Sequence, residues 1–376
     1  MTDRSYAVLG VASLPPPITG QSVAADVLAK YLAFEGVEHE IVDLSRPFYA
    51  GSRYLAAARR AIQVASYPIR AERARRTCRH SPIFYLQLGQ STQAMLRDLP
   101  LLAWARRHRL PTVVHVHGAG FRRAFDAAPR LIRWPLGKLL GSVSAAIVLT
   151  PTLAPMFRGL VDSERVFVVG NGPDAELTAA AERFERGFER DPGDSALTIL
   201  YLSNLMDQKG YRAVLEAAAL ANRRGLQHRF VFAGAKTQMG SLDIEAYLRE
   251  HNLSNVTFLG PVHGLAKLDA LREADAFILP TYHPDEGQPI SIIEAMQFGL
   301  PIITTRQGGI VDLVVDDESG IFVPPRDPEA ILAAIERLSD RRRIERVSKA
   351  AREQGLQHTA AEHGRRMLDV FDLAAR

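Results

Sequence analysis

The sequence has almost no cysteine and no long hydrophobic segment. Cys78 is the only cysteine in 376 residues, so no disulfide can form within the chain, and a reducing compartment is expected. We interpret Cys78 as a bystander rather than a nucleophile. No apolar run approaches the roughly 20 residues of a membrane-spanning helix. The start of the chain lacks the charged and apolar pattern of a signal peptide. We therefore expect a cytoplasmic protein.

Length and composition are those of an ordinary globular chain. A chain of 376 residues is too long for one hydrophobic core and predicts two domains. The fractions of hydrophobic and charged residues, 47% and 23%, are typical of folded proteins. The net charge of +4 is small. With no recognisable nucleic-acid motif, we expect no nucleic-acid partner.

Short apolar segments alternate with helical segments along the whole chain, which predicts parallel sheets with helical crossovers. The predicted fold class is α/β, with two doubly wound domains. The predicted strands are 6–12, 39–44, 82–87, 112–117, 145–150 and 166–170 in the first half, and 197–202, 229–233, 256–259, 276–279, 301–304 and 321–323 in the second.

The domain limits follow from a charged stretch between the two halves. Residues 182–194 are rich in Glu, Arg and Asp and read as a linker. We predict an N-terminal domain over 1–188 and a C-terminal domain over 195–360. A final helix over 361–376 is expected to return to the N-terminal domain.

Two glutamates lie eight residues apart at the end of a predicted strand. Glu286 belongs to a Gly/Pro-containing loop after the strand 276–279, and Glu294 lies inside the following helix, two turns further on. Pro289 suits a first helical turn, and Gly299 suits a helix end. Because open α/β sheets bind ligands at the carboxyl ends of their strands, we expect both carboxylates in a binding site.

This block, EGQPISIIEAMQFGLPIITTRQGG, resembles the motif of retaining glycosyltransferases with the GT-B fold, in particular those of family 4 (glycosyl transferases group 1). The Glu-x7-Glu spacing, the Glu-Ala-Met around the second glutamate and the Gly308-Gly309 turn all match. The resemblance implies two Rossmann-like domains facing a central cleft. It covers most of the chain and is strongest from Asn204 to Asp327.

The loop after the first strand is a candidate phosphate site. Gly20 lies in the loop 14–21, which follows the first strand and precedes a helical pattern over 22–34, and a glycine at such a turn before a helix N-terminus suits an anion. Relatives usually have two adjacent glycines here, whereas this chain has Thr19-Gly20. A plain strand-to-helix connection is the alternative.

His117 ends the predicted strand 112–117 and is followed by glycine, as in matching family members, where the imidazole contacts the transferred sugar. His115 shares its face of the strand, and we interpret it as a core histidine. Asn171-Gly172 resembles the family's Asn-Gly at the end of the N-terminal domain, for which we expect a structural role between the domains.

Lys209-Gly210 looks like the family's diphosphate-binding lysine. Where relatives commonly have an arginine five residues earlier, this chain has Asn204. An amide can donate a hydrogen bond to a phosphate but brings no charge. Stabilisation of the leaving group would then rest more on Lys209.

The resemblance implies a role for each position. Glu294 would hold the ribose hydroxyls of the nucleotide, because carboxylates accept two hydrogen bonds from a diol. Glu286 and His117, with Lys209 at the diphosphate, form the expected catalytic group. The further expected donor-binding residues are Gly20, Asn204, Gly287, Gln288, Pro289, Ile290, Gly308 and Gly309.

No metal or other cofactor is expected. The sequence contains no Asp-x-Asp, which is the metal-diphosphate motif of the other glycosyltransferase fold. His283, Asp285 and Glu286 lie too close together in sequence to converge easily on one ion. The donor itself, a UDP- or GDP-linked sugar, is a substrate.

A basic segment, Arg53–Arg79, interleaves arginines with apolar residues. This pattern is typical of a basic amphipathic surface and predicts peripheral attachment to an anionic inner membrane. A solvated helical face is the alternative. In relatives this domain binds a saccharide or lipid-linked acceptor.

The sequence therefore predicts a retaining, metal-independent glycosyltransferase that moves a hexose-type sugar from a nucleotide sugar to a saccharide or lipid-linked acceptor in polysaccharide or glycan biosynthesis. Two alternatives remain. One is a nucleotide-sugar epimerase of the same architecture, and the other is a degenerate nucleotide-sugar-binding protein, for which Asn204 is the support.

Overall fold

The structure of the 376-residue chain is a computed structural model that describes residues 4–45, 53–187, 196–237, 240 and 244–376. The side chains of residues 53–61 also lie outside this description. The chain divides into two compact units, Met1–Gly172 with Ala360–Arg376, and Pro173–Thr359. We call them unit 1 and unit 2. In the described residues each contains a six-stranded sheet whose paired strands are all parallel, which confirms the predicted pair of doubly wound α/β domains.

The sheet of unit 1 has the strand order β2-β1-β3-β4-β5-β6. Each strand coincides with a segment predicted from the sequence, and several end one or two residues earlier. The strands are β1 (Tyr6–Ala12), β2 (His39–Asp43), β3 (Ser81–Gln87), β4 (Thr112–His115), β5 (Ala145–Val148) and β6 (Val166–Val168).

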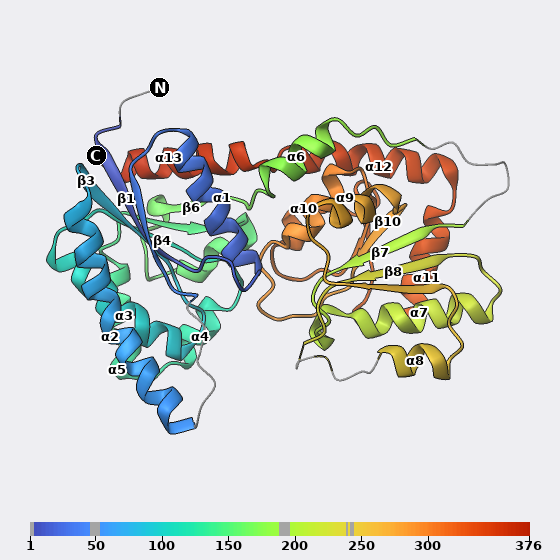
Figure 1. The fold of residues 1–376 in the computed structure, drawn as a ribbon, viewed down its shortest axis with the longest axis horizontal. Helices are drawn as coiled ribbons and strands as arrows, with labels where there is room; N and C mark the ends of the chain where they lie inside the picture. Colours follow the sequence, from blue (N-terminus) through green and yellow to red (C-terminus); the bar gives the residue numbers. More distant parts are fainter. Residues whose placement is uncertain (1–3, 46–52, 188–195, 238–239, 241–243) are drawn as a thin grey trace. The chain divides into compact units, whose positions relative to one another are not determined.

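Helices cover both faces of this sheet (Figure 1). One hydrophobic cluster joins α2, α3, α4 and α5 to one face, and another joins α1 and α13 to the opposite face. The helices are α1 (Gly20–Phe34), α2 (Arg53–Thr77), α3 (Thr92–Arg107), α4 (Phe121–Ala127), α5 (Arg130–Leu140) and α13 (Ala360–Ala374), with short 3-10 helices η1 (Pro151–Phe157) and η2 (Ser163–Arg165).

The sheet of unit 2 has the order β12-β11-β10-β7-β8-β9. Its strands are β7 (Thr198–Leu202), β8 (Arg229–Ala233), β9 (Val256–Gly260), β10 (Ala276–Leu279), β11 (Ile302–Thr304) and β12 (Gly320–Phe322). The four-residue strand β10 is entirely buried between neighbours on both sides. This explains its uninterrupted apolar sequence.

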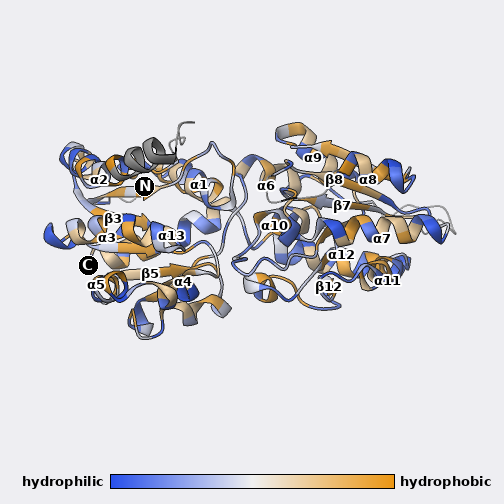
Figure 2. Ribbon diagram, turned by 90° about the horizontal axis from the view of Figure 1, so that it is seen from below, coloured by the Kyte–Doolittle hydropathy of each residue, from blue (hydrophilic) through white to orange (hydrophobic). Residues whose placement is uncertain are grey.

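The helices of unit 2 also lie on both faces of its sheet, with α7 and α8 on one side and α9 and α10 on the other (Figure 1). They are α6 (Ala175–Glu182), α7 (Tyr211–Arg223), α8 (Ile244–Glu250), α9 (Gly264–Glu273), α10 (Ile290–Gln297), α11 (Pro328–Leu338) and α12 (Arg341–Gly355), with η3 (Asp207–Lys209) and η4 (Gly308–Asp312). Hydropathy follows this layering, because hydrophobic residues concentrate on the strands and the inner helix faces (Figure 2).

The unit boundary lies at Gly172, whereas the sequence places the domain limit at residue 188. Helix α6 is grouped with unit 2 because it packs on α10, where the Thr178 hydroxyl donates to Gln297 Oε1 over 3.3 Å. Most of the predicted linker 182–194 lies outside the described residues. The terminal helix α13 packs on α1 within unit 1, and the Tyr6 hydroxyl donates to Asp372 over 2.5 Å.

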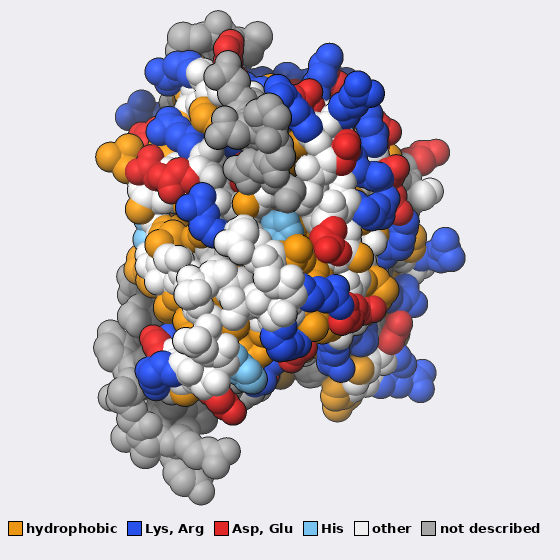
Figure 3. Space-filling model, turned by 90° about the vertical axis from the view of Figure 1, so that its right-hand side faces the viewer, with side chains coloured by type: hydrophobic (Ala, Val, Ile, Leu, Met, Phe, Trp, Pro, Cys, Tyr) orange, Lys and Arg blue, Asp and Glu red, His pale blue; other side chains and the backbone are white. Residues whose placement is uncertain are grey.

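The surface carries charges of both signs. Lys and Arg side chains alternate with Asp and Glu on the face shown in Figure 3. Within the described part of the chain, no helix combines the length and hydrophobicity needed to cross a membrane.

Candidate functional site

The strand order of unit 2 reverses between β7 and β10. From β7 the chain proceeds outward to β8 and β9, then returns to the other side of β7 to form β10. Open α/β sheets bind their ligands at this reversal, at the carboxyl ends of the strands. Lys209 follows β7 at the end of η3, and Glu286 follows β10. The topology therefore brings two predicted catalytic residues to the same point.

Lys209 and Glu286 form a close ion pair. The Lys209 ammonium donates to Glu286 Oε1 over 2.9 Å and to Oε2 over 2.7 Å, and the Thr281 hydroxyl donates to Oε2 over 2.8 Å. The Glu286 side chain is 7% exposed and that of Lys209 is 19% exposed. A buried carboxylate with this many donors is held in one orientation. Because the lysine is less buried, it can also present its charge to a ligand.

Two glycines allow the surrounding loops to approach this pair. Gly210 has φ +81°, and a Cβ there would lie 2.2 Å from the Pro280 carbonyl oxygen. Gly308 has φ +52°, and a Cβ there would lie 1.8 Å from the carbonyl oxygen of Glu286. Only glycine adopts both the left-handed backbone and this separation without strain. The Gly308-Gly309 turn predicted from sequence thus packs directly on the backbone that carries Glu286.

Hydrogen bonds join the same loops. The amide of Gly309 donates to the carbonyl of Gly287 over 2.9 Å, and the amide of Tyr282 donates to Gln208 over 2.8 Å. These bonds connect the segments after β7, β10 and β11. The predicted donor-binding residues of these loops therefore belong to one rigid assembly.

Helix α10 presents the second glutamate. Pro289 is its N-cap, one position before the first helical turn in which the sequence placed it, and Gly299, with φ +69°, follows its C-cap, as the sequence predicts. Glu294 is buried and forms an ion pair with Lys267 of α9. Burial raises the pKa of the Glu294 carboxyl above its ordinary value, and the charge of Lys267 lowers it in part. Lys267 thus keeps a buried carboxylate available as a hydrogen-bond acceptor.

Lys267 and Thr281 are site residues that the sequence did not reveal. Lys267 lies 27 residues before Glu294 in α9, a mostly exposed helix, where a lysine ordinarily faces solvent. Thr281 lies two residues after the predicted strand 276–279, and its position beyond the end of β10 was the one available signal.

The remaining predicted donor-binding residues of unit 2 differ in exposure. Gln288 and Ile290 are buried, next to Pro289 at the start of α10. Asn204 is exposed after β7. Its carbonyl accepts from the Met206 amide over 2.8 Å. Asn204, the residue that departs from the family pattern, therefore lies on the surface of unit 2, beyond the carboxyl end of β7 like Lys209.

The strand order of unit 1 reverses between β1 and β3, and Gln87 at the end of β3 links the loops there. Its Oε1 accepts from the Ser13 amide over 3.0 Å and from Gln21 Nε2 over 3.1 Å, and its Nε2 donates to the Gln21 carbonyl over 3.1 Å. Its Nε2 also lies 3.2 Å from Nε2 of His117. Gln87 is fully buried. Sequence analysis missed this residue, which reads locally as a strand end.

Helix α1 begins at the predicted phosphate loop. Thr19 caps it, since its hydroxyl accepts from the Ser22 amide over 3.1 Å, and the Ser22 hydroxyl accepts from the Thr19 amide over 2.9 Å. Gly20 is the first helical residue, and a Cβ there would meet no atom within 4 Å. The fold itself does not require glycine at this position, so the open space remains for a ligand.

His117 lies two residues beyond the end of β4, partly buried. Its ring lies against that of His115, with 3.9 Å between centroids, and His115 Nδ1 lies 3.0 Å from the Tyr85 hydroxyl. Desolvation, with the nearby His363, lowers the pKa of His117 to about 3, whereas hydrogen bonding to Asn171 raises it. Burial also holds the pKa values of His115 and His363 below their ordinary values. His117 is therefore neutral near pH 7.

Asn171 is buried at the end of unit 1, next to the boundary residue Gly172. The His363 Nδ1 lies 2.7 Å from the Gly170 carbonyl one residue earlier. These contacts join the end of the first sheet to α13. Among the described residues, no three His, Cys, Asp or Glu side chains are grouped closely enough to hold a metal ion.

The sequence of unit 2 matches a known family. Residues 196–341 match the model of the family described as glycosyl transferases group 1. A glycogen synthase of Mycobacterium tuberculosis (strain ATCC 25618 / H37Rv) is 26% identical over 269 residues, which cover 68% of this chain and 61% of that protein. The amylovoran biosynthesis glycosyltransferase AmsK of Erwinia amylovora is 30% identical over 161 residues, covering 40% of this chain and 38% of AmsK. The chain thus spans about three fifths or less of these relatives' length.

Solved structures resemble the whole chain. A sucrose-phosphate synthase from Thermosynechococcus elongatus has a TM-score of 0.71 at 18% identity, covering 99% of this chain and 100% of that one. HepE from Anabaena, in complex with UDP-glucose, has a TM-score of 0.67 at 15% identity, covering 97% and 99%. These likenesses confirm the predicted GT-B fold.

Proposed function

We infer a glycosyltransferase of polysaccharide or glycan biosynthesis from a chain whose residues 196–341 match the model of glycosyl transferases group 1 and whose fold is GT-B. We propose that it moves a hexose-type sugar from a nucleotide donor to a saccharide or lipid-linked acceptor with retention of configuration. The observation that carries the proposal is the pairing of Lys209 with Glu286 at the strand-order reversal of unit 2.

Three side chains of unit 2 have separate roles in the proposed reaction. Glu294, paired with Lys267, accepts hydrogen bonds from the two ribose hydroxyls. Lys209 neutralises the charge that develops on the diphosphate as the bond to the sugar breaks. Glu286, oriented by Lys209 and Thr281, accepts hydrogen bonds from sugar hydroxyls.

Retention needs no protein nucleophile in this scheme. The acceptor hydroxyl approaches the anomeric carbon on the face from which the diphosphate departs, and a leaving phosphate oxygen takes its proton. His117 contacts the sugar as a neutral imidazole, because burial keeps its pKa low. It can therefore exchange hydrogen bonds with a hydroxyl without adding a positive charge.

We propose UDP or GDP as the nucleotide. The structural neighbour HepE binds UDP-glucose, and its fold extends over nearly the whole of this chain. The proposed reaction requires no metal, since Lys209 supplies the cation at the diphosphate. Transfer that stops in a chelator and resumes with magnesium or manganese would refute metal independence.

We also propose peripheral attachment of this cytoplasmic enzyme to an anionic membrane through α2. Ile62 and Ile69 are exposed on this helix, and they supply apolar area beside its arginines. Glu72 forms ion pairs with Arg75 and Arg76, and its single charge offsets one of their two. Failure to sediment with anionic vesicles at low salt would refute this attachment.

The deciding experiment follows the anomeric proton of the product by NMR during transfer from the donor that binds. Net transfer with the donor's anomeric configuration retained supports the proposal. An inverted product would refute the retaining mechanism. Conversion of the nucleotide sugar without an acceptor would instead indicate an epimerase, an alternative that the named relatives do not favour.

A further inference from the structure

A surface pocket of unit 1 lies away from all of the residues considered so far. It has a volume of about 340 Å³ and is lined by Leu102, Arg106, Arg109, Leu110, Pro111, Thr112, Leu139, Ser142, Val143 and Ser144. This volume falls within the range of about 300 to 1,000 Å³ typical of small-molecule sites. The pocket lies at the start of β4, whereas His117 lies beyond its end. It is therefore at the opposite edge of the sheet from the predicted sugar contact.

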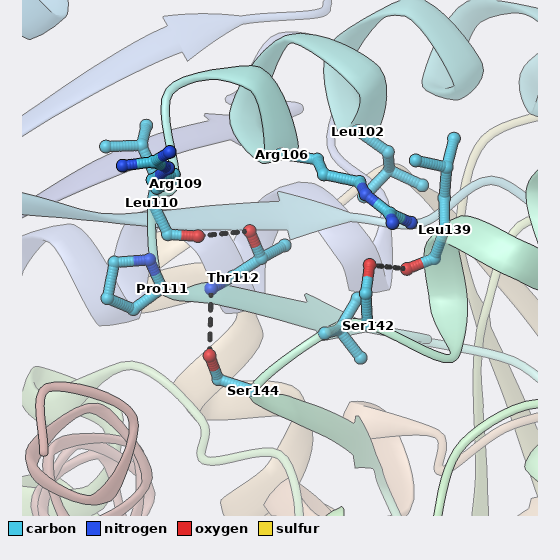
Figure 4. Close-up of a pocket in the computed structure, with 10 residues that line it drawn as sticks. Leu102, Arg106, Arg109, Leu110, Pro111, Thr112, Leu139, Ser142 and Ser144 are labelled. Atoms are coloured by element: carbon cyan, nitrogen blue, oxygen red, sulfur yellow. Dashed lines mark hydrogen bonds between the residues drawn. The ribbon is translucent and has the colours of Figure 1, made fainter.

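The lining combines an apolar floor with positive charge. Leu102 and Val143 are buried, and no acidic residue lines the pocket. Arg106 extends from the end of α3 toward Leu139, and Arg109 lies on the other side of the view (Figure 4). Nearby, Arg165 donates to the Val143 carbonyl over 2.8 Å. In the described part of the chain neither Arg106 nor Arg109 has an acidic partner, so both charges are available to an anion.

A serine adds a hydrogen-bond donor. Ser144 lines the pocket and its Oγ accepts from the Thr112 amide over 3.2 Å, a bond that does not use the hydroxyl proton. The hydroxyls of Thr112 and Ser142 instead donate to the carbonyls of Leu110 and Leu139. The donors that face the pocket are thus two guanidinium groups and one hydroxyl, a set that suits phosphate oxygens.

The backbone of Arg109 gives independent support. After α3, the Arg109 amide donates to Arg106 over 3.0 Å and the Leu110 amide to Ala105 over 3.0 Å, which is the Schellman pattern of a helix end. Arg109 therefore occupies the left-handed position, with φ +54°, where glycine is strongly favoured. The chain keeps an arginine side chain beside the pocket at a conformational cost.

We propose that this pocket binds a phosphomonoester, whose charge of about −1.5 to −2 at pH 7 matches the two arginines. The apolar floor accommodates the carbon skeleton that carries the phosphate. The site is separate from the donor site and does not depend on the proposed transfer reaction. The same phosphomonoester chemistry occurs in soluble metabolites and in the headgroup of phosphatidic acid, which the experiment distinguishes.

The test uses the full chain and two probes. Calorimetry measures binding of glycerol 3-phosphate, and co-sedimentation measures binding to phosphatidylcholine vesicles that contain phosphatidic acid. Vesicles with phosphatidylglycerol, a phosphodiester, control for general attraction to negative surfaces. The variants are Arg106→Gln and Arg109→Gly, with Arg107→Gln as control, because Arg107 is exposed on the same helix and does not line the pocket.

Binding of either probe should weaken by about ten- to a hundredfold in Arg106→Gln and Arg109→Gly and stay unchanged in Arg107→Gln. Arg109→Gly should melt no lower than the wild type, since glycine suits the left-handed position, so its loss of binding cannot be unfolding. Response to glycerol 3-phosphate would identify a soluble ligand, and response to phosphatidic acid alone a lipid headgroup. The proposal is overturned if neither probe binds, or if Arg106→Gln and Arg109→Gly keep wild-type affinity for glycerol 3-phosphate and lose no more affinity for phosphatidic acid vesicles than for phosphatidylglycerol vesicles.

Discussion

The ammonium of Lys209 lies within 2.9 Å of both carboxylate oxygens of Glu286, across the point where the strand order of unit 2 reverses. The two residues are 77 positions apart in the sequence. Their contact joins the proposed diphosphate site to the proposed sugar site. A substitution of one residue should therefore alter the site of the other.

A double-mutant cycle measures this coupling. Lys209→Met leaves the buried Glu286 carboxylate without its cation, and we expect a loss of about 1 to 3 kcal/mol in the free energy of unfolding. Adding Glu286→Gln should recover part of that loss, because no buried charge then remains. Urea denaturation of both single variants and the double variant gives the coupling. Purely additive losses would show that the pair is energetically unimportant.

Lys209 should contribute more to turnover than to the stability of the fold. Removing a donor from a charge that develops in the transition state typically costs about a hundred- to a thousandfold in kcat. We expect this loss in Lys209→Met, whereas the exposed Arg107→Gln should react normally. Steady-state kinetics with the identified donor gives the comparison, and a Lys209→Met enzyme with wild-type kcat would exclude the role at the leaving group.

Glu294 should make stability depend on pH. Because burial raises its folded-state pKa, the ionised carboxyl disfavours the folded protein, and wild-type stability falls as pH rises from the unfolded pKa through the folded one. Glu294→Gln removes this contribution of the carboxyl to the pH dependence of stability. The stability advantage of the variant should grow over that pH range and then level off, while nucleotide affinity is lost. Thermal melts across pH 4 to 8 test this, and a pH-independent difference would contradict it.

Lys267 supports the ionised form of Glu294. Replacing Lys267 by methionine should raise the Glu294 pKa further. As the pH is lowered, nucleotide affinity should therefore begin to fall at a higher pH than in the wild type. Nucleotide titrations at several pH values compare the two proteins. Identical pH profiles would mean that Lys267 does not tune the carboxylate.

Two glycines should respond to alanine in opposite ways. Gly20→Ala meets no atom, so the fold should be unaffected or stabilised by up to about 1 kcal/mol. Donor affinity should nevertheless fall if a phosphate approaches this amide. Gly308→Ala forces a left-handed alanine against the Glu286 carbonyl and should destabilise the protein by about 1 to 3 kcal/mol. Melting temperatures of both variants test the contrast in stability, which equal melting temperatures would contradict. Unchanged donor affinity in Gly20→Ala would show that no phosphate approaches this amide.

Buried histidines should make unit 1 sensitive to acid. The folded state lowers the pKa values of His115 and His363, so stability is lost as pH falls below about 6.5, the ordinary value, by about 1.4 kcal/mol per pH unit for each histidine. His363→Gln should reduce this slope, and the exposed His251→Gln should not. Equal slopes in all three proteins would contradict the assignment.

The fold was predictable because each strand is locally apolar and separated from the next by a helical segment. The residues at which the strands end were less predictable. β4 ends at His115, although the apolar pattern continues to His117. The end of β4 is set by its pairing with β3 and β5, which stops at His115, before the apolar pattern does. A sequence pattern does not contain that information.

The arrangement of the candidate site was predictable where its residues are continuous in sequence, and not where it depends on contacts between residues distant in sequence. Glu286, Glu294 and the Gly308-Gly309 turn belong to one block. Lys267 and Gln87 act through contacts with residues 27 and 66 positions away. Neither has a local signature, because a helix lysine and a strand-end glutamine are ordinary in their own segments.

The most direct test of the account is calorimetric titration of the protein and its Glu294→Gln variant with UDP, GDP, ADP and CMP in the presence of a chelator. The account predicts that UDP or GDP binds the wild type at one site without metal and that the variant loses this binding while remaining folded. Failure of all four nucleotides to bind the wild type, or equal binding by the variant, would contradict the proposed donor site.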